Sequence, residues 1–234
     1  MRFFHASDIP ESGNVVTLTK QESDHLFGTL RGRVGEYVGL LNGHGVEAEA
    51  EIIAGKQLLV HKKIIHPEPH PKIHLFCAAP RRKELDLLLK QCVEAGAWSI
   101  NLLECERSVA IPDGSALERW QTIAIEGCKQ SRNFWAPIIS PPVQLKSALA
   151  ELNGNSNFCK LYGHVAHDKK PIIPQCSDYA LFIGPEGGFT ADEETLMESC
   201  GVMPWHFSHN VLRLENAAVC GVMLLNYLTG VYSE

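Results

Sequence analysis

Short runs rich in apolar residues fill the beginning of the chain, and glycine-rich or polar breaks separate them. These runs predict strands at 37–41, 48–53 and 57–65. Asn42-Gly43-His44-Gly45, which lies between the first two, is typical of a hairpin turn. Strands with one apolar face must bury that face, so a small β-barrel is the expected closure.

Prolines then interrupt the pattern. The segment His66-Pro67-Glu68-Pro69-His70-Pro71 has too many prolines for a helix or a central strand, so it predicts a linker. We therefore expect two domains, a small one over 1–68 and a larger one over 72–234.

Beyond the linker, strand-like apolar runs alternate with helical periodicity. The runs predict strands at 73–78, 99–103, 157–162, 179–183 and 205–207. Apolar residues recur with helical spacing over 85–93 and 120–128. The final segment, 215–229, is apolar all round, which predicts a helix buried on nearly every side. Such alternation predicts an α/β fold in three layers, built on a mostly parallel sheet.

Two loops at expected strand ends carry most of the candidate chemistry. Ile183-Gly184-Pro185-Glu186-Gly187-Gly188-Phe189 leads into Thr190 and Glu193, which form a capping box that starts a helix. Leu212-Arg213-Leu214-Glu215-Asn216-Ala217 opens the final helix. Open α/β sheets bind ligands at the carboxyl ends of their strands, so the two loops predict a single pocket. A lone glycine-proline loop is also typical of a plain tight turn, which is the alternative.

Together the two loops resemble the S-adenosylmethionine pocket of the SPOUT methyltransferases, and within them the family that methylates N3 of a uridine in small-subunit (16S) ribosomal RNA. The resemblance extends along the chain through His25–Glu36, Leu41–Gly45, Pro80–Lys83, Glu94–Ala97, Glu106–Val109, Arg119–Trp120 and Glu126–Pro137. The chain departs from the family pattern at Asn133, Ser208, Leu214 and Asn216, and within Gln91–Gly96.

The resemblance also implies an architecture. It implies a PUA-like RNA-binding β-barrel over 1–68 and a SPOUT-like methyltransferase domain over 72–234, with a C-terminal trefoil knot within about 155–230. SPOUT enzymes are similarly arranged as homodimers, so we expect a homodimer with the final helix at its interface.

The implied cofactor is S-adenosyl-L-methionine, whose adenine, ribose and sulfonium need close backbone approach and apolar walls. Glycines such as Gly184 permit that approach, and Leu161-Tyr162-Gly163-His164 is expected to supply a third loop, although His164 alone is equally typical of a surface histidine. Glu186 and Glu215 also suit a structural role at helix N-termini. The expected cofactor-binding residues are Leu161, Tyr162, Gly163, Ile183, Gly184, Pro185, Glu186, Gly187, Gly188, Val211, Leu212, Glu215 and Ala217.

Arginines dominate the candidates for catalysis and RNA binding. Arg213, held between apolar neighbours, needs an anionic partner, and a uridine losing its N3 proton would supply one, so we expect it to be catalytic. Basic clusters and the family's motifs suggest RNA contacts for Arg31, Arg33, Arg81, Arg82, Lys83, Arg107, Gln130 and Arg132. A solvated charged face is the alternative for each cluster.

Composition narrows the context. Among 234 residues 45% are hydrophobic, as in a globular protein, and the net charge of −6 means that any RNA must meet local basic clusters. A signal pattern is not visible at the N-terminus, and no apolar run approaches the roughly 20 residues that cross a bilayer, so we expect a cytoplasmic protein with no membrane partner. The eight cysteines form no C-x-x-C and predict reduced core thiols, while His61, His66, His70 and His74 are irregularly spaced and indicate a solvated linker rather than a metal site.

Other classes of protein fit less well. No G-x-G-x-x-G opens a helix after a strand, which weakens a nicotinamide or flavin enzyme, and the Gly-Lys-Ser/Thr of a P-loop is missing. The remaining alternatives are a non-catalytic RNA-binding protein that retains the fold and a methyltransferase that acts on another RNA. A cofactor-binding measurement separates the first of these from an enzyme.

Overall fold

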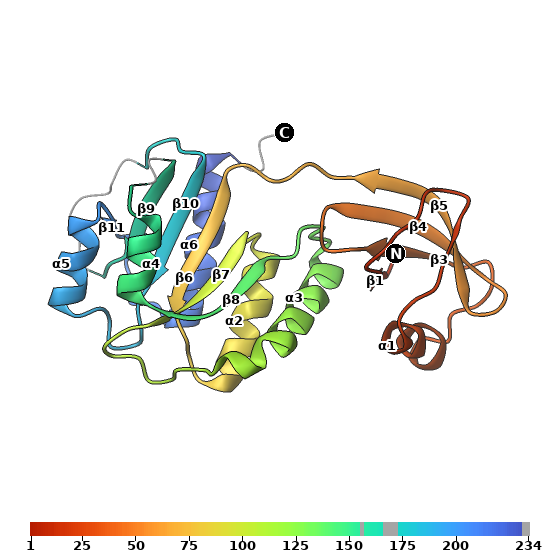
Figure 1. Ribbon diagram of the computed structural model, residues 1–234, viewed down its shortest axis with the longest axis horizontal. Coiled ribbons are helices and arrows are strands. Elements are labelled where there is room, and N and C mark those ends of the chain that lie inside the picture. The colour runs from red at the N-terminus through yellow and green to blue at the C-terminus, as the bar shows by residue number, and fades with distance from the viewer. Residues whose placement is uncertain (155–156, 166–172, 231–234) are drawn as a thin grey trace. The chain divides into compact units, whose positions relative to one another are not determined.

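The computed structural model describes residues 1–154, 157–165 and 173–230 (Figure 1). It divides into two compact units. The first combines Met1–Glu68 with Ile125–Ala136, and the second combines Pro69–Ala124 with Pro137–Glu234.

The first unit is built on a five-stranded sheet in the order β1-β3-β4-β5-β2. Its strands are β1 (Phe3–His5), β2 (Val15–Val16), β3 (Tyr37–Leu41), β4 (Val46–Ile53) and β5 (Gln57–Ile65). Only the β1–β3 pair is parallel among these neighbours. The expected hairpin forms, because the Asn42 side-chain oxygen accepts hydrogen bonds from the backbone N–H groups of His44 and Val46 at 2.8 and 3.1 Å.

A short helical segment separates β2 from β3, with α1 at Lys20–Ser23 and the π-helical turn η1 at Asp24–Thr29. One apolar core, which includes Phe4, Leu26 and Leu40, holds this segment against the sheet. Sequence periodicity does not reveal β1 and β2, because strands of three and two residues are too short to display alternation.

Residues 125–136 belong to the first unit, whereas the sequence interpretation places them in the second domain. Lys129 donates to the Glu22 carboxylate at 2.7 Å, and each side chain is only 9% exposed. Phe134 stacks on His66 with ring centroids 4.1 Å apart, and the indole N–H of Trp135 donates to the Pro67 carbonyl. The proline-rich segment is therefore packed at His66 rather than fully solvated.

The second unit contains a six-stranded sheet in the order β11-β9-β10-β6-β7-β8, and every neighbouring pair is parallel. Its strands are β6 (Lys72–Ala78), β7 (Ser99–Glu104), β8 (Ile138–Gln144), β9 (Phe158–Gly163), β10 (Asp178–Ile183) and β11 (Met203–Trp205). The α/β fold with a parallel sheet is thus confirmed. Strand β10 is buried from Tyr179 to Ile183, as expected of a strand with neighbours on both sides and helices over its faces.

Two strands differ from the prediction. Strand β8 contains Pro141 and Pro142 and is not anticipated, because proline disfavours a central strand and is tolerated mainly at an edge, where β8 lies. The strand predicted at 205–207 lies earlier in the chain. Strand β11 ends at Trp205, because Met203, Pro204 and Trp205 are the residues that pair with β9.

The helices of the second unit are α2 (Arg82–Glu94), α3 (Leu117–Ser131, shared with the first unit), α4 (Leu145–Leu152), α5 (Ala191–Ser199) and α6 (Leu214–Thr229), with a 3₁₀ turn at Gly114–Ala116. Helix α6 contacts β6, β10 and α2, and it lies on the opposite face of the sheet from α4 (Figure 1). Gly221 allows this close contact, because a Cβ atom at that position would lie 2.6 Å from Leu181 Cδ2.

Helix α6 is not buried all round, contrary to the prediction. Its core face includes Ala218, Val222 and Leu225, whereas Met223 and Tyr227 are 56% and 76% exposed. Hydropathy alone cannot separate these faces, since both are apolar. No helix among the described residues is long and apolar enough to span a membrane.

Candidate functional site

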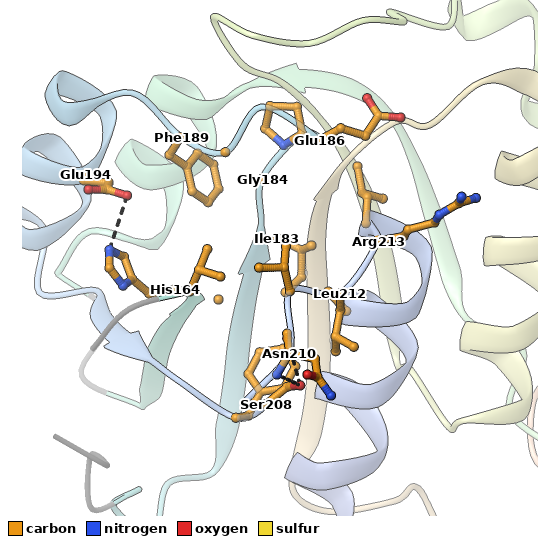
Figure 2. Close-up of a pocket in the computed structure, with 18 residues that line it drawn as sticks. His164, Ile183, Gly184, Glu186, Phe189, Glu194, Ser208, Asn210, Leu212 and Arg213 are labelled. Atoms are coloured by element: carbon orange, nitrogen blue, oxygen red, sulfur yellow. Dashed lines mark hydrogen bonds and ion pairs between the residues drawn. The ribbon is translucent and has the colours of Figure 1, made fainter. Parts of the chain in front are cut away.

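A cavity of about 350 Å³ lies at the carboxyl ends of β9 and β10 (Figure 2). It is lined by the residues after β9, by the glycine-rich loop after β10, by Glu194 of α5, and by the segment that leads from β11 into the first turn of α6. Three expected loops therefore meet at one edge of the sheet, and the predicted single pocket exists.

Parallel register brings these loops together. Phe182 of β10 is paired with Tyr162 of β9, so the next residues, Ile183 and Gly163, end their strands side by side. Trp205 of β11 is paired with Gly163 in turn. A Cβ atom at Gly163 would lie 3.0 Å from Ile183 Cδ1, so glycine keeps this corner of the cavity open.

The glycine-rich loop is held in a defined turn. The Gly188 N–H donates to the Pro185 carbonyl at 2.8 Å, and Gly188 has a left-handed backbone with φ of +71°. A Cβ atom at Gly184 would lie 3.1 Å from the Phe189 ring. The predicted capping box follows, with reciprocal hydrogen bonds between Thr190 and Glu193. Backbone, rather than side chains, therefore forms much of this wall.

The segment before α6 is closed by its own side chains. The Ser208 hydroxyl donates to the Asn210 carbonyl at 2.9 Å and accepts from the Asn210 N–H at 3.2 Å. Serine stands here where the resembled family usually has glycine, and its hydroxyl satisfies the turn. Arg213 is the N-cap residue of α6, and its carbonyl accepts from Ala217 N–H at 2.8 Å.

Charged groups lie at both ends of the cavity, with an apolar middle between them. Figure 2 shows His164 and Glu194 at one end, where their side chains approach to 3.7 Å, and Glu186 and Arg213 at the other. The Arg213 side chain is exposed and extends outward from the rim. Ile183, Leu212 and Phe189 supply apolar surface between these ends.

Two buried groups near the pocket stay protonated. Burial raises the pKa of the Tyr162 phenol well above its ordinary value, and the hydrogen bond to Glu198 at 3.1 Å raises it further. Burial, with Glu193 nearby, raises the pKa of the Cys105 thiol to about 12. Neither group can serve as a base or a nucleophile near neutral pH. Five of the eight cysteines are buried core residues, as the sequence suggests.

Most of the expected cofactor-binding residues line the cavity. Those that do are Gly163, Ile183, Gly184, Pro185, Glu186, Gly188, Val211, Leu212 and Ala217, and the expected catalytic residue Arg213 lies among them. Leu161 and Tyr162 do not, because both side chains are buried within β9. Glu215 and Gly187 also lie outside the lining, and a Cβ atom at Gly187 would lie 3.3 Å from Arg107 Cδ.

Several lining residues were not in the predicted set. They are His164, Val165, Phe189, Glu194, Phe207, Ser208, Asn210 and Leu214. Phe189 and Leu214 lie within the two motifs, so the motifs themselves could have indicated them. Glu194, in the first turn of α5, has no sequence signal, because its approach to His164 depends on how α5 packs.

The candidate RNA-binding residues lie in both units. Arg31 and Arg33 follow η1 and are exposed, and Gln130 and Arg132 belong to the segment that packs with the same unit. In the second unit Arg81 and Lys83 are exposed at the start of α2, and the Arg82 side chain lies outside what the structure describes. Arg107 is exposed as well, but its guanidinium contacts the glycine-rich loop.

Alanine at Gly188 tests whether the turn shapes the pocket. A left-handed backbone costs a residue with a Cβ atom about 1–2 kcal/mol, although nothing lies within 4 Å of the new atom. If the loop relaxes out of its binding geometry, Gly188→Ala weakens S-adenosylhomocysteine binding about 5- to 30-fold, measured by calorimetric titration. Gly201→Ala is the matched control, since Gly201 has φ of +75° and equally open space but does not line the cavity. Unchanged affinity in a folded Gly188→Ala variant would contradict the prediction.

Comparisons with known proteins place this geometry in a family. The sequence model of the RNA methyltransferase domain matches residues 66–226. The ribosomal RNA small subunit methyltransferase E of Synechocystis is 27% identical over 226 residues, which cover 91% of this chain and 73% of that protein. The Mycobacterium bovis protein of the same name is 25% identical over 239 residues, 97% of this chain and 91% of that one.

Solved structures agree. The ribosomal RNA small subunit methyltransferase E of Neisseria gonorrhoeae, bound to S-adenosyl methionine, superimposes with a TM-score of 0.88 at 25% identity, covering 97% of this chain and 98% of that one. A Legionella pneumophila structure in complex with the cofactor SAM gives a TM-score of 0.85 at 28% identity and covers 97% of each chain. With a family match over more than half of its length, a shared fold and a pocket built from both motifs, the chain belongs to the RNA methyltransferase domain family.

Proposed function

We propose that this protein transfers the methyl group of S-adenosyl-L-methionine to N3 of a uridine in small-subunit ribosomal RNA. The observation that carries the proposal is the cavity at the carboxyl edge of the parallel sheet, which is walled by both family motifs. Relatives named as small-subunit ribosomal RNA methyltransferases match nearly the whole chain and support the substrate class.

The residues present fit the cofactor. Glycines at 163 and 184 leave backbone where a side chain would fill the corner, and Ile183 and Leu212 offer apolar surface to an adenosine. When bound, S-adenosyl-L-methionine supplies an electrophilic methyl group. We assign its binding to the lining residues Gly163, Ile183, Gly184, Pro185, Glu186, Gly188, Val211, Leu212 and Ala217.

The substrate base needs both alignment and charge stabilisation. Uracil N3 is a weak nucleophile while protonated, and its lone pair becomes available only as the N3–H proton leaves and negative charge spreads to the flanking carbonyl oxygens. Arg213 lies at the rim and its side chain extends outward rather than toward the floor of the cavity, and we assign to it the contact with the incoming base. A guanidinium remains charged at neutral pH, and it can stabilise the developing anion without taking part in proton transfer.

RNA has to be held as well as modified. We assign phosphate contacts to Arg31, Arg33 and Arg132 in the first unit and to Arg81 and Lys83 at the start of α2, all of which are exposed. The first unit then corresponds to a PUA-like domain, and residues within about 155–230 to the trefoil knot of SPOUT proteins. Both assignments rest on the family resemblance, and a ribosomal RNA substrate would place the protein in the cytoplasm.

Nucleoside mass spectrometry of small-subunit ribosomal RNA from cells that lack the protein tests the function. We expect 3-methyluridine to be lost at one position and to return when the intact gene is restored. An unchanged level in small-subunit RNA, with loss from another RNA, would favour a methyltransferase with a different substrate. No loss from any RNA would favour a non-catalytic binding protein.

Arg213→Ala tests the chemical step. Removing one preorganised donor should lower the single-turnover methylation rate by roughly 10²–10³, with a much smaller change in cofactor affinity. Raising the pH should partly restore the variant, because a more alkaline solvent removes the N3 proton without help from the guanidinium. A rate within threefold of the parent, or loss confined to cofactor binding, would contradict this role.

The exposed side of α6 supports a homodimer. Met223, Tyr227 and Leu228 are 56%, 76% and 52% exposed, and such apolar patches are typical of protein interfaces. We propose that two copies of the chain bury this side against each other. The other proposed partner is small-subunit ribosomal RNA, either free or in the assembled small ribosomal subunit.

Sedimentation equilibrium at micromolar concentration tests the dimer. We expect about twice the chain mass of 25.9 kDa, and we expect Met223→Asp with Tyr227→Asp to sediment as a monomer. Val34→Asp is the control, because Val34 is also apolar and 69% exposed but lies in the first unit. A monomeric parent protein would contradict the proposal.

A further inference from the structure

The turn that follows β7 lies directly against the glycine-rich loop. The Arg107 guanidinium donates from Nη1 to the Gly187 carbonyl at 2.8 Å and to the Phe189 carbonyl at 3.4 Å. Beside it, the Glu106 backbone N–H donates to the Glu193 carboxylate at 2.8 Å. The turn thus touches the loop at two carbonyls and the following helix at its capping box.

The stem of Arg107 also packs against this loop. A Cβ atom at Gly187 would lie 3.3 Å from Arg107 Cδ and 3.6 Å from Arg107 Cβ. Glycine at 187 therefore accommodates the stem of the arginine, and Gly187 has no left-handed backbone that would require glycine for another reason.

The two sides of the loop do different things. Gly184, Gly188 and Phe189 line the cavity, whereas the carbonyls of Gly187 and Phe189 accept from Arg107. Phe189 both lines the cavity and accepts a hydrogen bond from Arg107, so the arginine directly contacts a residue of the cavity wall. A loop rich in glycine is intrinsically flexible, and external hydrogen bonds reduce the entropy that it loses when a ligand binds.

We propose that Arg107 is a positioning residue for the cofactor pocket, which holds the glycine-rich loop in its binding conformation, and that it is not a phosphate contact. The assignment rests on the proposed function and replaces the RNA-binding role that the family resemblance implies. An arginine suits this task because its rigid planar guanidinium holds the N–H bonds of Nη1 in fixed directions toward the two carbonyls, whereas the ammonium of lysine is a compact group that rotates freely.

The two roles give different measurable results. A phosphate contact contributes about one unit to the slope of log affinity against log salt concentration for RNA binding, and contributes nothing to cofactor affinity. A positioning residue alters cofactor affinity and leaves the salt slope unchanged. Arg81→Ala is the matched control, because Arg81 is an exposed arginine at the start of α2 and is expected to contact RNA.

The test compares Arg107→Ala, Arg107→Lys and Arg81→Ala in the full chain, each checked for folding by its thermal transition. S-Adenosylhomocysteine affinity is measured by calorimetry. The affinity for a small-subunit ribosomal RNA fragment is measured at several salt concentrations, and the methylation rate is measured at saturating RNA. We expect Arg107→Ala to weaken S-adenosylhomocysteine binding about 10- to 100-fold, and to raise KM for S-adenosylmethionine with kcat within threefold. Arg107→Lys should recover part of that loss, and the salt slope should match the parent. Arg81→Ala should keep the S-adenosylhomocysteine affinity of the parent and reduce the salt slope of RNA binding.

Parent-like S-adenosylhomocysteine affinity in folded Arg107→Ala, or a salt slope reduced as in Arg81→Ala, would overturn the assignment alone. Absence of S-adenosylhomocysteine binding by the unaltered protein would overturn the proposed function and the assignment with it.

Discussion

Parallel pairing between β9 and β10 is the constraint on which the site depends. It sets Gly163 and Ile183 at the same level, and β11 extends the same register to Trp205. A slip of one residue would turn every side chain to the other face and disrupt its packing, so the closely packed run from Tyr179 to Ile183 fixes the register. The close contact of α6 with Leu181 at Gly221 then fixes where the last loop ends and the helix begins. The pocket is therefore assembled by strand pairing and helix packing that extend beyond its own lining residues.

In this arrangement the residues that shape the cavity differ from the charged residues available for catalysis. Backbone and apolar side chains form the walls of the cavity, while charged side chains lie at its ends and on its rim. Arg107 and Arg213 illustrate the difference: one is tied to carbonyls of the cavity wall, and the other projects outward. A net charge of −6 is compatible with an RNA substrate, because screening confines each arginine's influence to about 10 Å and local groups decide.

Features that depend on residues close together in the sequence could be predicted from it, whereas features that depend on distant residues could not. Strand β4 and the capping box at Thr190 are set by neighbouring residues, so alternation and spacing predict them. The prolines of strand β8 conceal it in the sequence, because its pairing with β7, and not its local sequence, makes it a strand. Within the site, the motifs locate the loops but do not tell which glycine faces the ligand. Gly187 and Gly188 are adjacent, yet only the folded turn shows that one faces Arg107 and the other lines the cavity.

The packing of residues 125–136 into the first unit has a consequence for synthesis. A ribosome releases the chain from its N-terminus at about 5–20 residues per second, and domains usually fold as they emerge. Here Glu22 is made early, whereas Lys129, which donates a hydrogen bond to its carboxylate, is made more than a hundred residues later. Until then a carboxylate that is destined for burial has no cation beside it, so the first unit is incomplete while much of the second is being made. The first unit can therefore be completed only after residues 69–124 of the second unit have been made.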